Sequence, residues 1–165
     1  NPDHLQMNLN LLEKTGSEIK ITEGNIILKS SGNVNPVDME TEPFPGFPTD
    51  LQAQWMALMA FANGESTIID NVYIDRFTHI SELTRLGAKI SLEKNKATIT
   101  GNKKLNGAEI MSTDIRASAS LIIAALVANG ESSISRIYHI DRGYEKIEEK
   151  FRSLGADIWR KSDRN

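Results

Sequence analysis

The sequence predicts a mixed α/β fold assembled from copies of one folding unit. The first reason is an internal repeat: residues 63–68 read NGESTI, and residues 129–134 read NGESSI. The second reason is that segments with helical spacing of apolar residues alternate with short runs typical of strands. The third is the composition, with 39% hydrophobic and 25% charged residues, which is ordinary for a globular protein and argues against disorder.

Further pairs of segments support the repeat and keep the same order along the chain. They are 49–53 with 113–117, 74–76 with 140–142, and 86–88 with 154–156. A partial third copy opens the chain, where residues 11–19 parallel residues 82–90. A chain that begins inside a unit leaves apolar surface uncovered, so we expect this chain to be a fragment of a longer protein.

The composition and charge exclude several classes of function. The net charge is -3, with 19 basic and 22 acidic residues, which disfavours a general nucleic-acid binder. There is no cysteine, so disulfides, cysteine zinc sites, thiolate nucleophiles and iron–sulfur clusters are excluded. His4, His79 and His139 lack the spacing of metal ligands. The longest apolar run, 121–128, is too short to span a membrane, and no secretory signal is visible, so we expect a cytoplasmic protein.

Each full unit is expected to begin with a helix, at Thr49 in one copy and at Thr113 in the other. Threonine is a good N-cap, and the aspartate that follows each threonine favours the positive end of the helix dipole. The second of these helices is apolar on nearly all sides over 117–128, which predicts that protein encloses it. Asn-Gly pairs at 63–64 and 129–130 are expected to end the two helices.

A strand is expected after each of these helices, over 66–72 and over 132–138. Hairpins are expected over 18–28 and over 88–100, because short β-type runs flank turn residues there. Strands in this alternation with helices predict mixed sheets that cover helices.

A shorter amphipathic helix is expected after each of the strands 66–72 and 132–138. In the second copy its apolar face consists of Tyr144, Ile147, Phe151 and Leu154. Glu148 is expected to pair with Arg152 one turn further along this helix. Upstream, three prolines make residues 42–48 a stiff, non-helical approach to the first full helix.

The repeat places charged residues at equivalent ends of its elements. Asp50 and Asp114 lie at helix starts, Arg76 and Arg142 lie at strand-to-helix turns, and Arg116 adds a cation beside Asp114. Units related by rotation would gather these side chains at one end of the domain, where arginines bind carboxylate or phosphate. The alternative is that they are capping charges and local salt bridges in a noncatalytic packing or interaction domain.

Three segments, 43–54, 112–120 and 136–145, carry a resemblance to a known family. They resemble the UDP-N-acetylglucosamine 1-carboxyvinyltransferases, which are enolpyruvyl transferases, and the likeness extends from the opening hairpin to about residue 158. The resemblance implies an inside-out α/β barrel of the enolpyruvyl transferase type, with helices inside and sheets outside.

In that family two globular halves each contain three such units. This chain would be the carboxy-terminal part of the second half, with about two and a third units. The implied boundaries are 1–33, 34–101 and 102–165.

The resemblance implies transfer of the enolpyruvyl group of phosphoenolpyruvate to the 3-hydroxyl of UDP-N-acetylglucosamine, with release of phosphate. This is the first committed step of peptidoglycan synthesis, and no cofactor or metal is implied. Asp50 matches the family's proposed base, which also binds the sugar. Val72, with Tyr73 beside it, matches a contact to the nucleotide sugar. The residues that match the lining of the cleft between the halves are Arg76, Asp114, Arg116 and Arg142.

Several family residues have no counterpart in this chain. The catalytic cysteine, the lysine and most arginines that hold phosphoenolpyruvate lie on the other, amino-terminal domain. We therefore expect this chain alone to be inactive and to bind the sugar nucleotide weakly. Neither nucleic acid nor a membrane is an expected partner. Within the family, the alternative is a 5-enolpyruvylshikimate-3-phosphate synthase, which shares the fold and the donor.

Overall fold

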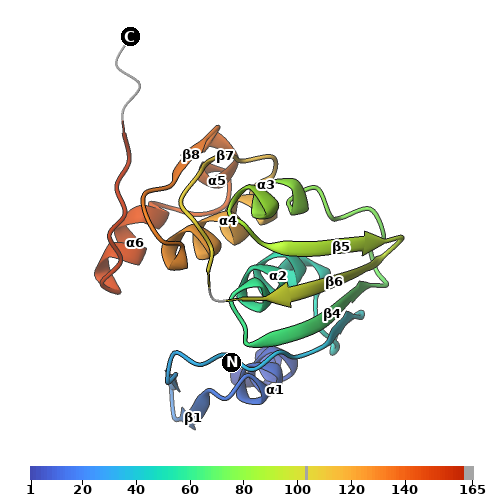
Figure 1. Cartoon of the computed structure of the whole chain (residues 1–165). Coiled ribbons are helices and arrows are strands. Elements are labelled where there is room, and N and C mark those ends of the chain that lie inside the picture. The colour runs from blue at the N-terminus through green and yellow to red at the C-terminus, as the bar shows by residue number, and fades with distance from the viewer. Residues whose placement is uncertain (103, 162–165) are drawn as a thin grey trace.

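Helices and strands alternate along the chain in the computed structural model, which describes residues 1–102 and 104–161 (Figure 1). The amino-terminal elements are η1 (Pro2–Leu5), α1 (Gln6–Lys14), β1 (Glu18–Thr22), β2 (Asn25–Lys29), β3 (Met39–Thr41), η2 (Thr49–Leu51), α2 (Gln52–Ala60) and β4 (Gly64–Asp70). The remaining elements are α3 (Ile80–Arg85), β5 (Lys89–Glu93), β6 (Lys96–Gly101), β7 (Glu109–Met111), α4 (Ile115–Val127), β8 (Ser133–Ser135), α5 (Tyr138–Asp141) and α6 (Ile147–Ser153). The predicted mixed α/β class is confirmed. Residues 103 and 162–165 of the expected unit 102–165 lie outside the described residues.

The main sheet has four strands in the order β3-β4-β6-β5. β3 runs parallel to β4, whereas β6 is antiparallel to both of its neighbours. Ile68 of β4 pairs with Met39 on one side and with Ala97 on the other, and all three side chains are buried. α2 lies against one face of this sheet (Figure 1), so the apolar side of the sheet is covered by the helix.

The second helix of the repeat, α4, packs beside α2. Its buried side chains are mostly small, including Ala117, Ser118, Ser120 and Ala124, and the larger Leu121 is fully buried among them. Small side chains let two helices approach closely without leaving voids. The expectation that protein encloses this helix is confirmed over most of its length, although Val127 at its end is exposed.

The repeat is visible in the backbone as well as in the sequence. After α1, α3 and α6 the chain turns at a glycine with positive φ, at Gly16 (+96°), Gly87 (+91°) and Gly155 (+93°). In each turn the glycine amide donates to the carbonyl three residues earlier at 2.9 Å. A side chain at any of these positions would be strained, which explains why the Gly is found in every copy.

Hydrogen bonds between loops also recur from copy to copy. In each case the backbone amide of an asparagine donates to the backbone carbonyl of a residue that lies 20 to 29 positions earlier, at 2.8–2.9 Å, and so joins two loops. The bonds are Asn35 N to Thr15 O, Asn106 N to Leu86 O, Asn63 N to Val34 O and Asn129 N to Leu105 O. The matched segments of the sequence therefore adopt matched backbone conformations.

Both hairpins are confirmed. β1 pairs antiparallel with β2, and β5 pairs antiparallel with β6. The strand expected over 66–72 is β4, which ends at Asp70. The strand expected over 132–138 is wrong beyond Ser135, because Arg136 has a φ of +56° that interrupts the extended backbone and Tyr138 begins α5.

The expected threonine N-caps are also wrong. Asp114, not Thr113, caps α4: its Oδ1 accepts hydrogen bonds from the amides of Arg116 (2.8 Å) and Ala117 (3.0 Å). Thr49 begins the 3-10 helix η2 instead of capping α2, and its hydroxyl donates to Asp70 at 2.7 Å. Neither η2 nor α2 has a side-chain N-cap, so the Thr49 oxygen does not act as one.

The Asn-Gly pairs do not form the helix caps themselves. α2 ends at Ala60 and α4 ends at Val127, so the glycines of the pairs lie a few residues further along. Gly64 and Gly130 do have positive φ, at +137° and +91°. They therefore turn the chain after each helix and not at its last residue.

The last helix differs from its expected pairing and packing. Ile147 is buried, and Tyr144 and Phe151 pack against it, but Leu154 is 81% exposed because α6 ends at Ser153. Glu148 pairs with Arg160 of the carboxy-terminal segment at 3.1 Å, and not with Arg152. Arg160 also bonds Asp141, and two carboxylates hold its fork more firmly than one.

No helix within residues 1–102 and 104–161 is both long enough and apolar enough to cross a membrane.

Truncation of Leu121 tests the packing of α4 against α2. Leu121→Ala removes a fully buried side chain and leaves a cavity, so we expect the free energy of unfolding to fall by about 2–5 kcal/mol. Urea unfolding measures the change. The matched control is Val127→Ala at the exposed end of the same helix, with an expected loss below about 1 kcal/mol. Equal losses in the two variants would contradict this packing.

Candidate functional site

Three of the predicted site residues meet at one carboxylate oxygen. Arg76 Nη1 lies 3.0 Å from Asp50 Oδ1, and Arg116 Nε lies 2.6 Å from the same atom. Asp50 belongs to η2, Arg76 to the loop after β4, and Arg116 to the first turn of α4. Since the Asp50 side chain is 65% exposed, the cluster is open to solvent and to a ligand.

Arg76 is the most firmly held member of this cluster. Its guanidinium lies 4.6 Å from the centre of the Tyr73 ring, and Nη1 also donates to Thr49 Oγ1 at 3.1 Å. The side chain is only 18% exposed. A cation over an aromatic face and between two oxygen acceptors has few alternative rotamers, so Arg76 is pre-organised.

The two arginines hold the pKa of the Asp50 carboxyl below its usual value of 3.8. The hydrogen bond from Arg116 is the largest cause, and the charges of Arg116 and Arg76 act in the same direction, whereas partial burial opposes them. Asp50 is therefore ionised at neutral pH. In this state it is a strong hydrogen-bond acceptor for a hydroxyl and a weak base.

Asp114 lies on the neighbouring helix start and has a different set of partners. Besides capping α4 through Oδ1, it accepts a hydrogen bond from Thr78 on Oδ2 at 3.3 Å. His79, next to Thr78, is almost fully buried, and this burial lowers its pKa to about 4, with the charge of Asp114 opposing the shift. The imidazole is thus neutral at physiological pH.

Val72 and Tyr73 follow β4, and their side chains are about half exposed. Their backbone amides donate to Asp70 Oδ1 at 3.1 and 2.8 Å, so the loop that carries them is held close to the sheet. Since the Tyr73 ring lies against Arg76, this predicted sugar-contacting loop adjoins the Asp50 cluster.

Arg142 is the predicted site residue that the structure leaves apart. It is exposed at the C-cap of α5. Among residues 1–102 and 104–161, no hydrogen bond or ion pair joins Arg142 to the other predicted site residues. A guanidinium at this position is free to turn toward a bound anion.

Thr49 and Asp70 belong to the site although the sequence did not single them out. Thr49 was expected only as a cap, and Asp70 only as a strand residue. The available signal was an aspartate at the end of an otherwise apolar and hydroxyl-bearing strand, directly before the Val72–Tyr73 pair. Such a residue must find hydrogen-bond donors when it is buried.

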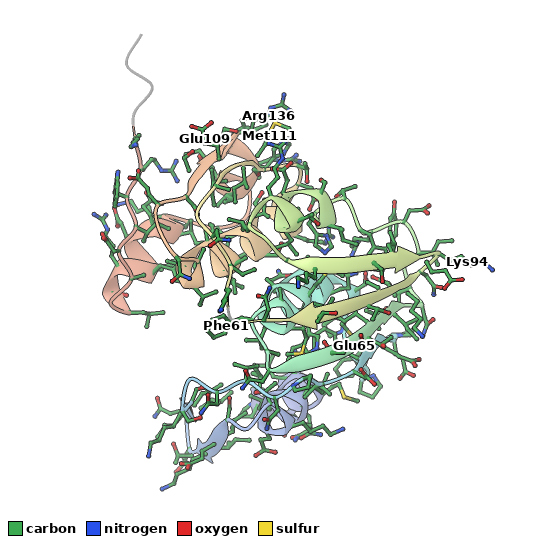
Figure 2. All side chains as sticks on the ribbon, in the orientation of Figure 1. Phe61, Glu65, Lys94, Glu109, Met111 and Arg136 are labelled. Atoms are coloured by element: carbon green, nitrogen blue, oxygen red, sulfur yellow. The ribbon has the colours of Figure 1, made fainter. Side chains whose placement is uncertain are left out.

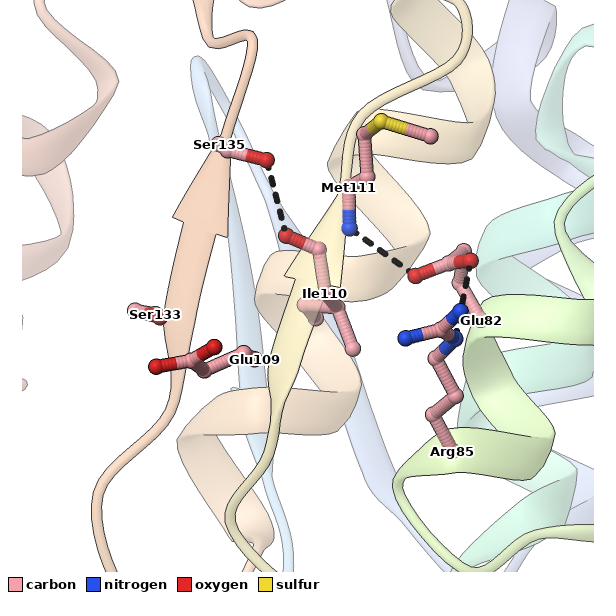
Figure 3. Close-up of a pocket in the computed structure, with 7 residues that line it drawn as sticks. All are labelled: Glu82, Arg85, Glu109, Ile110, Met111, Ser133 and Ser135. Carbon is pink, nitrogen blue, oxygen red and sulfur yellow. Dashed lines mark hydrogen bonds and ion pairs between the residues drawn. The ribbon is translucent and has the colours of Figure 1, made fainter.

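A pocket of about 430 Å³ lies elsewhere, between α3 and the β7–β8 pair (Figure 3). The residues that line it are Glu82, Arg85, Glu109, Ile110, Met111, Ser133 and Ser135. The Glu82 carboxylate there accepts a hydrogen bond from the Met111 amide at 2.9 Å and pairs with Arg85 at 3.3 Å. These polar groups satisfy one another and protect the edge of β7, which is a structural role.

No group of three or more His, Cys, Asp or Glu side chains suited to a metal ion occurs in the described part of the chain, 1–102 and 104–161.

Comparison with known proteins identifies close relatives. The model of the EPSP synthase family (3-phosphoshikimate 1-carboxyvinyltransferase) matches residues 1–151. Proteins named UDP-N-acetylglucosamine 1-carboxyvinyltransferase match from Chlorobium luteolum (52% identity, 96% of this chain) and Pelagibacter ubique (49%, 96%). This chain spans 38% of the length of each, and the predicted resemblance is confirmed.

Solved structures show the same fold. The enolpyruvyl transferase NikO from Streptomyces tendae matches with a TM-score of 0.83 and 27% identity, over 93% of this chain and 36% of NikO. An EPSP synthase from Acinetobacter baumannii matches with a TM-score of 0.58 and 17% identity, over 85% of this chain and 36% of that one. The second likeness concerns the fold alone.

Removal of one arginine tests the electrostatics of Asp50. In Arg116→Met the hydrogen bond that contributes most to the low pKa is lost, so the pKa of Asp50 is expected to rise toward 3.8. A carbon-13 NMR titration of the Asp50 carboxyl measures it. Arg85→Met, which removes a guanidinium paired with Glu82 instead, is expected to leave the midpoint unchanged. An unchanged midpoint in Arg116→Met would contradict the cluster.

The buried His79 predicts a pH dependence of stability. Its pKa is about 4 in the folded chain and near 6.5 when unfolded, so the unfolded state binds more protons between these values. Stability therefore falls as pH decreases from 6.5 toward 4, by about 2 kcal/mol between pH 7.5 and 5. His79→Gln is expected to abolish this dependence of the unfolding free energy on pH. His4→Gln, at an exposed position, is expected to retain it. Parallel pH profiles of unfolding for His79→Gln and the unsubstituted chain would exclude this role.

Proposed function

The chain belongs to the EPSP synthase family, and we propose that it forms part of a longer enolpyruvyl transferase that acts on UDP-N-acetylglucosamine. The reaction moves the enolpyruvyl group of phosphoenolpyruvate to the sugar 3-hydroxyl and releases phosphate. The observation that carries the proposal is the convergence of Arg76 and Arg116 on the exposed Asp50. It occurs in a chain that is 52% identical to proteins named for this reaction.

The proposal includes an architecture for the whole protein. The chain would contribute the carboxy-terminal part of the second domain, an inside-out α/β barrel with helices inside and sheets outside. Its units would be 1–33, 34–101 and 102–165, or about two and a third copies. The recurring glycine turns and loop hydrogen bonds support this division. The other domain would supply the opposite wall of the cleft.

In this mechanism Asp50 receives the sugar. Its ionised carboxylate accepts a hydrogen bond from the 3-hydroxyl, and the proton passes to Asp50 as the hydroxyl oxygen attacks the substituted enol carbon. A proton from an acid on the other domain goes to the methylene carbon, which gives a tetrahedral intermediate. Loss of phosphate and of one methyl proton then forms the enol ether. The base needs hydrogen-bond reach to the hydroxyl, which an exposed carboxylate allows.

The arginines serve the anionic groups. Arg76 and Arg116 are placed to balance the carboxylate and phosphate of the donor and the charge of the intermediate. Asp114 and Arg142 would lie along the same cleft. Val72 and Tyr73 would contact the nucleotide sugar, which their exposed side chains beside Arg76 permit. No cofactor or metal takes part in this scheme.

Such a protein would take part in peptidoglycan synthesis, and thereby in cell-wall biogenesis, cell shape and division. Its substrates, a nucleotide sugar and phosphoenolpyruvate, are metabolites of the cytoplasm, which supports a cytoplasmic location. Nucleic acid and membrane are not partners in this proposal.

A second candidate acceptor is shikimate 3-phosphate, because the matching family takes its name from that reaction. The relatives at about 50% identity favour the sugar nucleotide. A noncatalytic packing domain is the third alternative, in which the Asp50 cluster is only a salt bridge. Assay of the intact protein with each acceptor, by phosphate release from phosphoenolpyruvate, separates the three.

Loss of the base tests the assignment of Asp50. Asp50→Asn in the intact protein is expected to lower kcat about 10²–10⁴-fold, because the amide accepts no proton from the sugar hydroxyl. The control Asp157→Asn changes an exposed aspartate elsewhere and is expected to keep kcat within about twofold. The 165-residue chain alone is expected to show no turnover. Unchanged turnover in a folded Asp50→Asn protein would favour the noncatalytic alternative.

A further inference from the structure

The strongest unexplained feature outside the predicted site residues is the carboxylate of Asp70. This side chain is fully buried at the end of β4. Oδ1 accepts hydrogen bonds from Thr41 Oγ1 (2.7 Å), Val72 N (3.1 Å) and Tyr73 N (2.8 Å), and Oδ2 accepts one from Thr49 Oγ1 (2.7 Å). Within the described residues no cation pairs with it. Donors from three separate segments thus compensate for the burial of this group.

One of these bonds leads directly to the candidate site. The Thr49 hydroxyl has a single proton, which it donates to Asp70, so it faces Arg76 as an acceptor. Arg76 Nη1 donates to Thr49 Oγ1 at 3.1 Å and to Asp50 Oδ1 at 3.0 Å. Asp70 therefore sets the direction of the Thr49 hydroxyl, and this direction holds the Arg76 guanidinium beside Asp50.

The other bonds place the loop that carries the predicted sugar contacts. Because both Val72 N and Tyr73 N point at Asp70 Oδ1, the loop turns tightly after β4. That turn brings the Tyr73 ring to 4.6 Å from the Arg76 guanidinium. Arg76 is thus held on one side through Thr49 and on the other through Tyr73, and both supports originate at Asp70.

The second copy of the unit shows that the fold itself does not require this carboxylate. When the NGESTI and NGESSI segments are superposed, Asp70 falls on Arg136, which is exposed and lies near Met111 at the end of β8 (Figure 2). By strand register, the counterpart of Thr41 is Ser112, whose hydroxyl bonds Ser118 instead. The chain after Arg136 forms the short helix α5 in place of the irregular loop. The buried acceptor is therefore specific to the unit that contains Asp50.

We propose that Asp70 is a positioning residue for enolpyruvyl transfer, which orients Arg76 through Thr49 and holds the Val72–Tyr73 loop in its binding conformation. This inference rests on the proposed function for its kinetic consequences. Asp70 itself does not touch the substrate, and its effect passes through Thr49 and through the backbone amides of Val72 and Tyr73. A residue of this kind changes both substrate affinity and turnover when it is lost.

The kinetic test compares two threonines that bond the same carboxylate. In the intact enzyme, Thr49→Val breaks the link to Arg76. Thr41→Val also removes a donor to Asp70, together with the acceptor of the Asn71 amide, but leaves Thr49 between Asp70 and Arg76. We expect kcat/KM to fall at least tenfold in Thr49→Val and less than threefold in Thr41→Val, at similar losses of Tm. Thr49→Ser keeps a hydroxyl and is expected to restore activity to within threefold. Activity losses that follow the loss of Tm in both variants, or no rescue by serine, would overturn the proposal.

Asp70→Asn tests the acceptor itself. The amide nitrogen donates to Thr49 where the carboxylate accepted, so the hydroxyl loses its orientation. We expect KM for the nucleotide sugar to rise about tenfold and kcat to fall about tenfold. Asp38→Asn is the control, because Asp38, the exposed residue directly before β3, also accepts a backbone amide, from Thr67 at 2.7 Å, but makes no hydrogen bond to the Val72–Tyr73 loop. Kinetics of Asp70→Asn equal to those of Asp38→Asn would refute the role.

Hydrogen exchange separates this inference from the proposed function. In the 165-residue chain, Asp70→Ala is expected to speed amide exchange at Val72 and Tyr73 at least tenfold, and Asp38→Ala to leave both amides unchanged. If the intact protein transfers no enolpyruvyl group, the proposed function fails, and exchange still reports on the loop. Unchanged exchange at both amides in Asp70→Ala overturns the inference whatever the activity. If that variant does not fold, Asp70→Asn is measured instead against the same criterion.

Discussion

The packing of α2 beside α4 is the constraint on which the candidate site depends. Asp50 lies just before α2 and Arg116 lies in the first turn of α4, so their 2.6 Å contact exists only if both helices begin at the same end of the domain. Small side chains such as Ala117 and Ser120 allow that close approach. A repeated unit achieves this arrangement simply, because the corresponding helix of each copy begins at the same end of the domain. The site is thus a consequence of repetition more than of any one loop.

Local sequence signals predicted the fold best where the structure is itself local. The hairpins β1–β2 and β5–β6 follow from turn residues between short strands, and both lie where they were expected. The strand over 132–138 failed because a single backbone angle, the positive φ of Arg136, ends it early, and arginine carries no signal for that conformation. The threonine caps failed for a different reason. The Thr49 hydroxyl bonds Asp70 and Arg76, which are both distant in sequence, and no local pattern reveals these contacts.

Site residues could be predicted where charged residues recur at equivalent positions of the repeat. They could not be predicted where a residue's role depends on its burial in the folded chain. Asp50, Arg76 and Arg116 were expected together because their positions recur at element ends, and they share one oxygen. Asp70 was missed because two of its four donors, Thr41 and Thr49, are more than twenty residues away in the sequence and reach it only in the folded chain, whereas the other two are the local amides of its own turn. Its chemistry belongs to the folded chain, since an aspartate on an exposed strand end would need none of these partners.

The same contacts that stabilise the Asp50 cluster also restrain its chemistry. A carboxylate held by two guanidinium groups is a good acceptor and a poor base, because each arginine favours the ionised form. We expect an anion that pairs with Arg76 or Arg116 to weaken their hold on Asp50 and thereby to raise its pKa toward the ordinary value. Under the proposed reaction, binding of the anionic donor therefore strengthens the base that acts on the acceptor. Because Thr49 and Tyr73 also hold Arg76, we expect this release to involve mainly Arg116, whose side chain is about twice as exposed, at 36% against 18%.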